Sequence, residues 1–437
     1  MEKKIINLSS IFLYLVPLSF ILGPTVSEGL ILIASVLIIF LIFKNKDFYL
    51  FKKNFFYFFL IINIFLIISS VLAEFKSLSL KSTVPYFRWT LYLVTIYYLS
   101  IKKLSFIRNF SLSFLVCFIL FFIDSSIQFT FGKNILGYET IISNRISSFF
   151  KDELILGSFV LKIVPIILFY LFLYNHEFKY KKLLLILICL TAFLMIFVSG
   201  ERSSTYLFIL YLLSFSIIFF KKIYREIKYV GFFIIFFLTI IYFFNENYKG
   251  RMFDNFFNSL TNKIEHNQIT NSKFKNFSIF SFIHEKHITS AYLMFRKGDL
   301  KTKLFGVGPK NFRNFCGDMK YCDYQNCCST HPHNIPAQIL SETGLIGIII
   351  LSSVYLILIK IIIMSLFHNI KYQINFKDSA NIFLVLGILI AIFPISTSGN
   401  FFHNKYSILL YSLVGIYYAS LNKNLIPEKK INFFYQV

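Results

Sequence analysis

Twelve apolar runs dominate this sequence of 437 residues, and most of them are long enough to cross a lipid bilayer. A helix rises about 1.5 Å per residue, so about 20 apolar residues span the hydrocarbon core, which is about 30 Å thick. The runs cover residues 8–23, 27–43, 55–73, 86–100, 110–130, 154–174, 183–199, 203–220, 230–244, 340–366, 379–396 and 402–420. The pattern predicts an all-α polytopic membrane protein with about twelve transmembrane helices.

The composition supports this class. Hydrophobic residues make up 57% of the chain and the mean hydropathy is +0.68, more apolar surface than a soluble protein of this length can bury. No small-x-small cleavage site follows the first run, which indicates an uncleaved first helix rather than a signal peptide. The net charge of +23 would suggest nucleic acid as the partner of a soluble protein, but the positions of the charges favour a lipid bilayer.

The loops between the runs carry their positive charge unevenly. If the N-terminus is cytoplasmic, the short cytoplasmic segments hold 21 Lys and Arg residues and the short outer segments hold 8. This asymmetry follows the positive-inside rule, and a missed or added helix in the middle of the chain would destroy it. The sequence therefore predicts that both termini are cytoplasmic.

The polar stretch from residue 245 to residue 339 is then a large loop on the outer face. It holds 13 Lys and Arg residues, which does not contradict the topology because long loops cross the membrane regardless of charge. Loops of this length usually carry function, and residues 287–300 are typical of an amphipathic helix. The expected organisation is nine helices in residues 1–244, the loop in 245–339, and three helices in 340–437.

Four of the six cysteines lie within thirteen residues of this loop: Cys316, Cys322, Cys327 and Cys328. An oxidising compartment favours disulfides. A bond between the neighbours Cys327 and Cys328 would be strained, so each is expected to pair with Cys316 or Cys322. A zinc site that joins thiolates to His331 and His333 is the alternative.

Three polar segments lie at the predicted outer edge of the membrane. They are the turn at residues 199–204 with Arg202, the segment at 292–297 with Arg296, which is followed by two glycines in residues 304–309, and the His-Pro-His-Asn sequence at 331–334. Each has a simpler reading: an arginine that reaches lipid headgroups, a surface charge, and a helix start with Asn334 as N-cap. Together they suit phosphate chemistry, because arginine binds phosphate oxygens bidentately and histidine accepts a proton at neutral pH.

Three polar residues fall inside predicted membrane helices. Asp124 and Gln128 lie four residues apart in one run, and Lys162 lies in the next run. Charges at membrane depth are costly and are usually paired. The sequence therefore predicts a structural pair between Asp124 and Lys162.

The order of these motifs resembles the O-antigen ligase and O-antigen polymerase superfamily. The resemblance consists of a Gly-x-Arg turn after the seventh helix, an arginine-containing helix with Phe-Gly-Val-Gly-Pro after the ninth, and His-x-His-Asn followed by Glu-x-Gly-x-x-Gly entering the tenth. The segment 331–347 is its most specific part. Pro336 departs from the bulky residue expected there, and the cysteine cluster is not a general feature of the family.

The resemblance implies an inverting, metal-independent glycosyltransferase without cofactor, in the inner (cytoplasmic) membrane of a bacterium and with a periplasmic active site. Arg202 and Arg296 would bind the diphosphate of a polyprenyl-diphosphate-linked glycan donor, and Arg145 matches a position where the family often keeps a basic residue. His333, or failing that His331, would activate the hydroxyl of the acceptor. The acceptor would be lipid A–core, as in lipopolysaccharide biosynthesis, or another glycan.

Three other functions fit parts of the sequence. An O-antigen polymerase would use the same donor but join repeat units to one another. A transporter of envelope glycans would concentrate its unusual residues near the middle of the membrane and often shows internal repeats, neither of which this sequence has. A non-catalytic scaffold would leave the two arginines and the histidine unexplained.

Overall fold

The computed structural model describes residues 1–140, 145–174, 180–244, 246–254, 282–322, 327–371 and 376–422. In these ranges the regular structure is helical, with one isolated β-bridge between Lys133 and Glu139. The long helices are α1 (Glu2–Ser19), α2 (Pro24–Asn45), α3 (Asn54–Leu72), α5 (Phe87–Lys102), α6 (Phe106–Phe131), α7 (Leu156–Tyr174), α8 (Lys181–Val198), α9 (Arg202–Phe244), α12 (Phe282–Lys297), α15 (Ile335–Lys371), α16 (Phe376–Ala391) and α17 (Asn404–Ser420). The short ones are α4 (Lys76–Thr83), α10 (Glu246–Lys249), α13 (Leu300–Phe305) and α14 (Phe312–Phe315), with a π-helical turn η3 (Gly250–Asp254) and the 3-10 turns η1 (Phe48–Lys52) and η2 (Ser148–Phe150).

The described ranges contain seven helices long and apolar enough to cross a membrane, which makes the chain a multi-pass membrane protein. They are α2, α3, α6, α7, α8, the first part of α9 and α15. The other five predicted spans fall on α1, α5, α16, α17 and the second part of α9, which are shorter or carry more charge. The count of twelve therefore stays a prediction.

Helix α7 lies at the centre of the bundle and α15 at its edge. In the apolar stretch of α7 that could span the membrane, 94% of the residues are buried, whereas only 17% are buried in that of α15. The reason is its neighbours, since α7 packs against α6, α8, α9, α16 and α17. A helix that is apolar on all sides, as α7 is, suits such a central position.

The element α9 contains both of the runs predicted at 203–220 and 230–244, and it doubles back on itself. Phe219 packs against Phe172, which lies near the end of α7 where the chain leads into α8. Phe237 packs against Phe197, which lies at the other end of α8. A straight helix of 43 residues would extend about 65 Å and could not make both contacts. The return brings Tyr248 to the end of α8, where its hydroxyl donates to the carbonyl of Val198 (3.0 Å).

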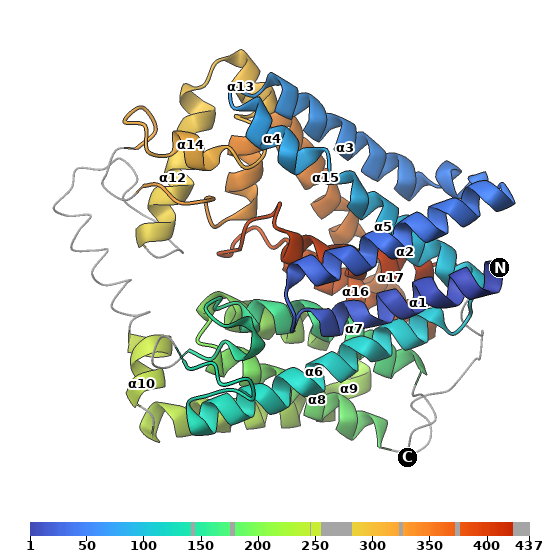
Figure 1. Cartoon of the computed structure of the whole chain (residues 1–437). Helices are drawn as coiled ribbons and strands as arrows, with labels where there is room; N and C mark the ends of the chain where they lie inside the picture. The colour runs from blue at the N-terminus through green and yellow to red at the C-terminus, as the bar shows by residue number, and fades with distance from the viewer. Residues whose placement is uncertain are drawn as a thin grey trace.

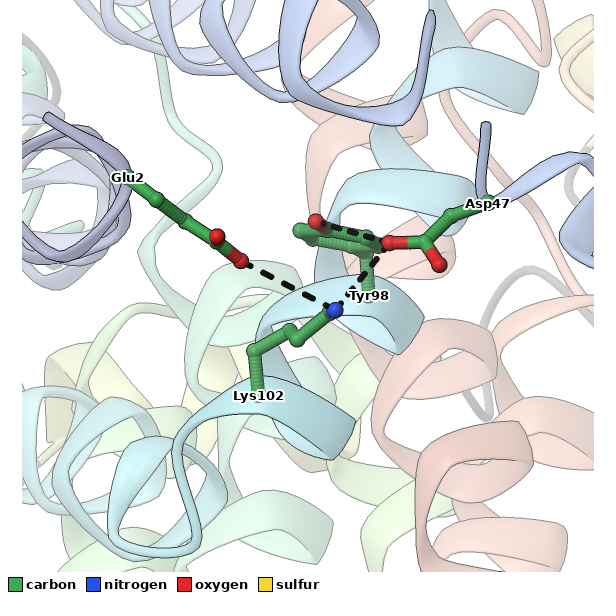
Figure 2. Close-up of polar contacts among 4 residues, drawn as sticks. All are labelled: Glu2, Asp47, Tyr98 and Lys102. Atoms are coloured by element: carbon green, nitrogen blue, oxygen red, sulfur yellow. Dashed lines mark hydrogen bonds and ion pairs between the residues drawn. The ribbon is translucent and has the colours of Figure 1, made fainter. Parts of the chain in front are cut away.

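Two ends of the bundle can be distinguished in Figure 1. Helices α10, α12 and α14 lie at one end, which we call the α12 end, and the N-terminus lies at the other. At the N-terminal end, Lys102 on α5 forms ion pairs with Asp47 (3.1 Å) and Glu2 (3.8 Å), and Tyr98 donates a hydrogen bond to Asp47 (Figure 2). This group joins α1, α2 and α5, although partly exposed pairs of this kind add only about 0–1 kcal/mol each.

Candidate active site

The His-Pro-His-Asn segment lies at the α12 end, directly before α15. Asn334 caps this helix: its side-chain oxygen accepts a hydrogen bond from the backbone N–H of Ala337 (3.0 Å), and α15 begins at Ile335. The prediction of Asn334 as a helix N-cap is confirmed. His333 has a φ of +56°, a left-handed backbone that costs a residue with a side chain about 1–3 kcal/mol and that often marks functional sites.

The loop between α16 and α17 holds this segment in place. The backbone N–H of Ser398 donates to the carbonyl of His333 (2.8 Å), and the side chain of Asn334 donates to the carbonyls of Pro394 (2.8 Å) and Ser396 (3.1 Å). One turn into α15, Gln338 donates to Asn400 (3.0 Å) and accepts from the N–H of Phe401 (2.9 Å). Together these hydrogen bonds hold the backbone at His333 in its strained conformation.

The ring of His333 lies close to the rings of three other histidines. The ring of His333 lies 4.1 Å from that of His331, 5.1 Å from that of His284 and 5.4 Å from that of His287, measured between ring centroids. His284 and His287 belong to the first turns of α12. Burial, together with the charges of His331, His284 and His287, lowers the pKa of His333 to about 3. His333 is therefore neutral at pH 7.

The hydrogen bonds of His331 define its tautomer. Its Nε2 lies 3.2 Å from the carbonyl oxygen of Ser398, which can only accept, so Nε2 carries the proton. Its Nδ1 then accepts from the hydroxyl of Thr330 (2.9 Å). Burial lowers the pKa of His331 to about 4, and both ring nitrogens are occupied. His333 also has partners at its ring: its Nε2 lies 3.1 Å from the hydroxyl of Ser329, and a hydrogen bond with the backbone of Ser398 acts against the lowering of its pKa.

Three arginines converge on the turn between α8 and α9. Arg251 on η3 donates from Nε to the carbonyl of Gly200 (3.0 Å), and Arg145 donates to the carbonyls of Ser199 (3.4 Å) and Leu154 (3.2 Å). Arg202 follows the same turn and begins α9. Burial lowers the pKa of Arg251, and the charges of Arg145 and Arg202 lower it further, which shows how close the three guanidinium groups lie. We call Arg145, Arg202 and Arg251 the arginine cluster.

Glu201, beside the arginine cluster, is engaged elsewhere. Its carboxylate accepts from the N–H groups of Gly157 (2.7 Å) and Ser158 (3.1 Å) at the start of α7, and from the hydroxyl of Ser204 (2.9 Å). A carboxylate at a helix N-terminus is favourable because it meets unpaired N–H groups and the positive end of the helix dipole. Glu201 therefore fixes the turn to α7 while the arginines lie around it.

His284 links the arginine cluster to the histidines. Burial lowers the pKa of His284, and the charges of His287 and Arg202 lower it further. The ring of His284 lies 5.1 Å from that of His333, and the same imidazole is within electrostatic reach of Arg202. The structure thus brings Arg145, Arg202, His331 and His333 into one region.

Arg296 does not join this region. It is exposed, near the end of α12 and twelve residues after His284, which corresponds to about 18 Å along the helix axis. Among the described residues, no hydrogen bond or ion pair connects it to the arginine cluster. The predicted helix at 287–300 is present as α12, displaced by a few residues, and the role of Arg296 stays a prediction.

All four loop cysteines form disulfides. Cys316 pairs with Cys328 and Cys322 with Cys327, which confirms that each of the two neighbours bonds to a more distant partner. The zinc alternative is wrong for these cysteines because no thiolate is left to bind a metal. In the described part of the chain, no group of three or more His, Cys, Asp or Glu side chains is arranged to hold a metal ion.

The expected pair between Asp124 and Lys162 is wrong. Asp124 accepts from Ser148 (2.5 Å), Ile135 (2.9 Å) and Asn134 (3.3 Å), all in the segment that follows α6. Lys162 instead donates to the carbonyl of Ser158 (3.0 Å) one turn back along α7. The buried carboxylate is satisfied by a loop that folds onto its own helix, so it needs no cation from α7.

Sequence reasoning missed four participants: Arg251, His284, His287 and Ser398. Arg251 lies far from the recognised motifs, and the two histidines lie at or just before the start of the predicted helix at 287–300, where nothing in the sequence links them to His333. Ser398 had a signal, the polar run Ser-Thr-Ser-Gly-Asn at 396–400 between two apolar helices. Such a run marks a loop, but not the segment that the loop contacts.

These features define the class of the protein: a multi-pass α-helical membrane protein with a buried histidine site and an arginine cluster at one end of its bundle. Residues 185–352 match the family described as O-antigen ligase. The match supports a relation to the O-antigen ligase superfamily, whose members are membrane enzymes of the ligase and polymerase type. The matched segment runs from α8 into α15 and contains Arg202, Arg251, His284 and His333. A search of curated proteins finds no match to this chain.

Proposed function

We propose that this protein is a glycosyltransferase that moves a glycan from a polyprenyl diphosphate to an acceptor hydroxyl, in the manner of an O-antigen ligase. The observation that carries the proposal is the contact of His284 with the neutral His333, because His284 is also within electrostatic reach of Arg202 in the arginine cluster. His333, Arg202 and Arg251 lie within the segment that matches the family, residues 185–352, and Arg145 lies before it.

The arginine cluster is the binding site for the donor diphosphate. Each guanidinium has five N–H donors, and the bonds to the turn at 199–200 use only one or two of them on Arg251 and Arg145. The guanidinium of Arg202 makes no hydrogen bond within the described residues. The free donors suit phosphate oxygens, and their fixed positive charge stabilises the diphosphate as it leaves.

His333 activates the acceptor. A neutral imidazole can take the proton of a hydroxyl as that hydroxyl attacks, whereas His331 already uses both ring nitrogens. The low pKa of His333 keeps it unprotonated at neutral pH. Its ring contacts those of His331 and His284, which restricts how it can turn.

The reaction then proceeds by one displacement. The acceptor oxygen forms a bond to the anomeric carbon while the bond from that carbon to the diphosphate oxygen breaks, which inverts the configuration. The proton of the acceptor moves to His333, and polyprenyl diphosphate leaves on the arginine cluster. The arginines supply the positive charge that a metal ion provides in other phosphate sites.

The proposed location is the inner membrane of a bacterium, with the α12 end in the periplasm and both termini in the cytoplasm. The charge asymmetry of the loops and the disulfides of residues 316–328 support this orientation, since disulfides persist in the periplasm. The large segment 245–339 is then the periplasmic part of the active site.

The test is a transfer assay with the purified protein in lipid vesicles, supplied with undecaprenyl-diphosphate-linked oligosaccharide and lipid A–core. We expect a glycosylated lipid A–core and release of undecaprenyl diphosphate. The His333→Ala variant should lose about 10²–10⁴-fold in kcat, the range for removal of a general base. The His331→Ala variant should fold less stably but keep more activity. Full transfer by His333→Ala would remove the histidine from the mechanism.

A further inference from the structure

Helix α6 carries two buried polar side chains, Asp124 and Gln128, which lie four residues apart. The helix is long and apolar enough to cross a membrane, where a buried polar group is costly. Within the described residues, their side-chain hydrogen bonds go to the segment between α6 and α7 and to no other helix. That segment carries Arg145 of the arginine cluster. The cost of the two polar groups is therefore linked to the segment that brings Arg145 to its place.

Gln128 holds the backbone that follows Arg145. Its Oε1 accepts from the N–H groups of Ser148 (2.7 Å) and Ser147 (3.2 Å), and its Nε2 donates to the carbonyl of Tyr138 (3.2 Å). One amide thus joins the part of the segment before Arg145 to the part after it. The backbone at 147–148 cannot leave α6 without leaving buried N–H groups unpaired.

Asp124 holds the same backbone through a side chain. Its Oδ2 accepts from the hydroxyl of Ser148 (2.5 Å) and from the amide of Asn134 (3.3 Å), and its Oδ1 accepts from the N–H of Ile135 (2.9 Å). The amide of Asn134 also donates to the carbonyl of Ser148 (3.2 Å). Ser148 has a left-handed backbone, with a φ of +52°. Such a conformation persists where surrounding contacts fix it, and it often marks a functional site.

The other side of this backbone meets the end of α8. The N–H of Ile146 donates to the carbonyl of Val198 (3.4 Å), and the guanidinium of Arg145 donates to the carbonyl of Ser199 (3.4 Å). Ser147, which is bound to Gln128, follows Arg145 by only two residues. The anchor on α6 therefore largely determines where Arg145 can lie.

We propose that Asp124 and Gln128 are positioning residues for the donor site. They hold residues 145–148 against α6, so that the guanidinium of Arg145 lies at the turn between α8 and α9. Neither residue touches the substrate. The inference rests on the proposed function, which assigns the donor diphosphate to the arginine cluster. Arginine binds phosphate through N–H groups of fixed direction, so a displacement of about 1 Å is enough to weaken the interaction.

A network that only stabilised the fold would behave differently. Breaking it would lower Tm but would leave the donor KM of the folded protein unchanged. A positioning network, in contrast, changes the donor KM, and it does so only while Arg145 is present. The dependence on Arg145 therefore distinguishes the two roles.

The first experiment titrates undecaprenyl-diphosphate-linked oligosaccharide at saturating lipid A–core in lipid vesicles. Gln128→Leu should raise the donor KM about tenfold, close to the effect of Arg145→Ala, and should leave the acceptor KM unchanged. In the Arg145→Ala background, Gln128→Leu should cause no further rise, because the arginine that it positions is gone. Asn63→Leu is the matched control, since it removes another buried amide, which joins α3 to α5. It should lower Tm and keep the donor KM of the wild type.

The second experiment uses Ser148→Ala, which changes the segment rather than the helix. It removes only the hydroxyl that binds Asp124, so it should fold even if Gln128→Leu does not. We expect its donor KM to rise about threefold, again only in the presence of Arg145. If the wild type transfers and the folded variants keep its donor KM, or raise it equally without Arg145, the inference is wrong and the proposed function stands. No transfer by the wild type would reject the proposed function and the inference with it.

Discussion

At the scale of single residues, His333 is the group on which the proposed mechanism depends. Its backbone is left-handed, its carbonyl accepts from Ser398, and its ring contacts the rings of His331, His284 and His287. Strain of this kind persists only where surrounding contacts fix it, and such sites are often functional. The neighbouring His331 uses both ring nitrogens in hydrogen bonds, which is why the proposal assigns the proton transfer to His333.

The structure and the sequence motifs point to different arginines: the structure includes Arg251 in the arginine cluster, and the motifs include Arg296. Arg251→Ala should lower kcat/KM in the transfer assay by about 10²–10³-fold, as expected when a charged donor to a leaving group is lost. Arg296→Ala should have an effect below about threefold, because the residue is exposed about 18 Å along α12 from His284. A severe loss in Arg296→Ala with a mild one in Arg251→Ala would contradict the arrangement described above.

The depressed pKa values of His331 and His333 predict how stability depends on pH. In the unfolded chain both titrate near 6.5, and in the folded chain they titrate near 4 and 3. Below about pH 6.5 the unfolded chain therefore binds protons that the folded chain does not, and stability falls as the pH falls from about 6.5 to about 4. In a thermal-unfolding measurement, the decrease in Tm between pH 7.5 and pH 5 should be smaller for His331→Gln than for the wild type. An equal or larger decrease would contradict the assigned pKa direction.

At the scale of elements, the start of α15 depends on a close crossing of two glycines. Gly306 has a φ of +75° and Gly344 one of +67°, and a Cβ on Gly306 would lie 2.2 Å from the carbonyl carbon of Glu342. The N–H groups of Val307 and Gly308 donate to the carbonyls of Ser341 and Glu342 across this crossing. Gly344 also interrupts the helical backbone of α15. The crossing thus fixes the loop that carries Lys310 against α15.

Substitution at this crossing should unfold the α12 end. Gly306→Ala places a side chain where neither the backbone conformation nor the space allows one, and we expect a loss of at least about 2 kcal/mol in stability. Gly29→Ala on α2 is the matched control, because a Cβ there meets nothing within 4 Å. The measurement is Tm in detergent together with transfer activity. Equal Tm values for the two variants would show that the crossing is not a constraint.

The sequence predicts elements well where the signal is local. Hydrophobic runs predict the long helices, and Asn334 before Ile335 predicts the start of α15 through capping chemistry. The sequence does not predict contacts that depend on the tertiary structure. Arg251 reaches the arginine cluster only because α9 doubles back, and Asp124 meets Ser148 rather than Lys162 because a loop folds onto α6. No periodicity or spacing in a single sequence encodes either contact.

At the scale of the whole molecule, the arginine cluster and the histidines lie at the α12 end of a membrane bundle. Arg202 begins α9, Arg251 lies on η3, and Arg145 lies in the segment between α6 and α7. The histidines belong to α12 and to the segment before α15. The proposed transferase activity depends on these separate segments meeting at one end of the bundle.

The most direct test of the central claim is made in the cell that carries the gene. The gene is deleted, and surface polysaccharide is compared on a gel after complementation with the wild type or with His333→Ala. We predict that polymer disappears from lipid A–core in the deletion strain while lipid-linked polymer accumulates, and that only the wild type restores it. A core that carries a single repeat would instead indicate a polymerase with the same chemistry. Full restoration by His333→Ala would contradict the account.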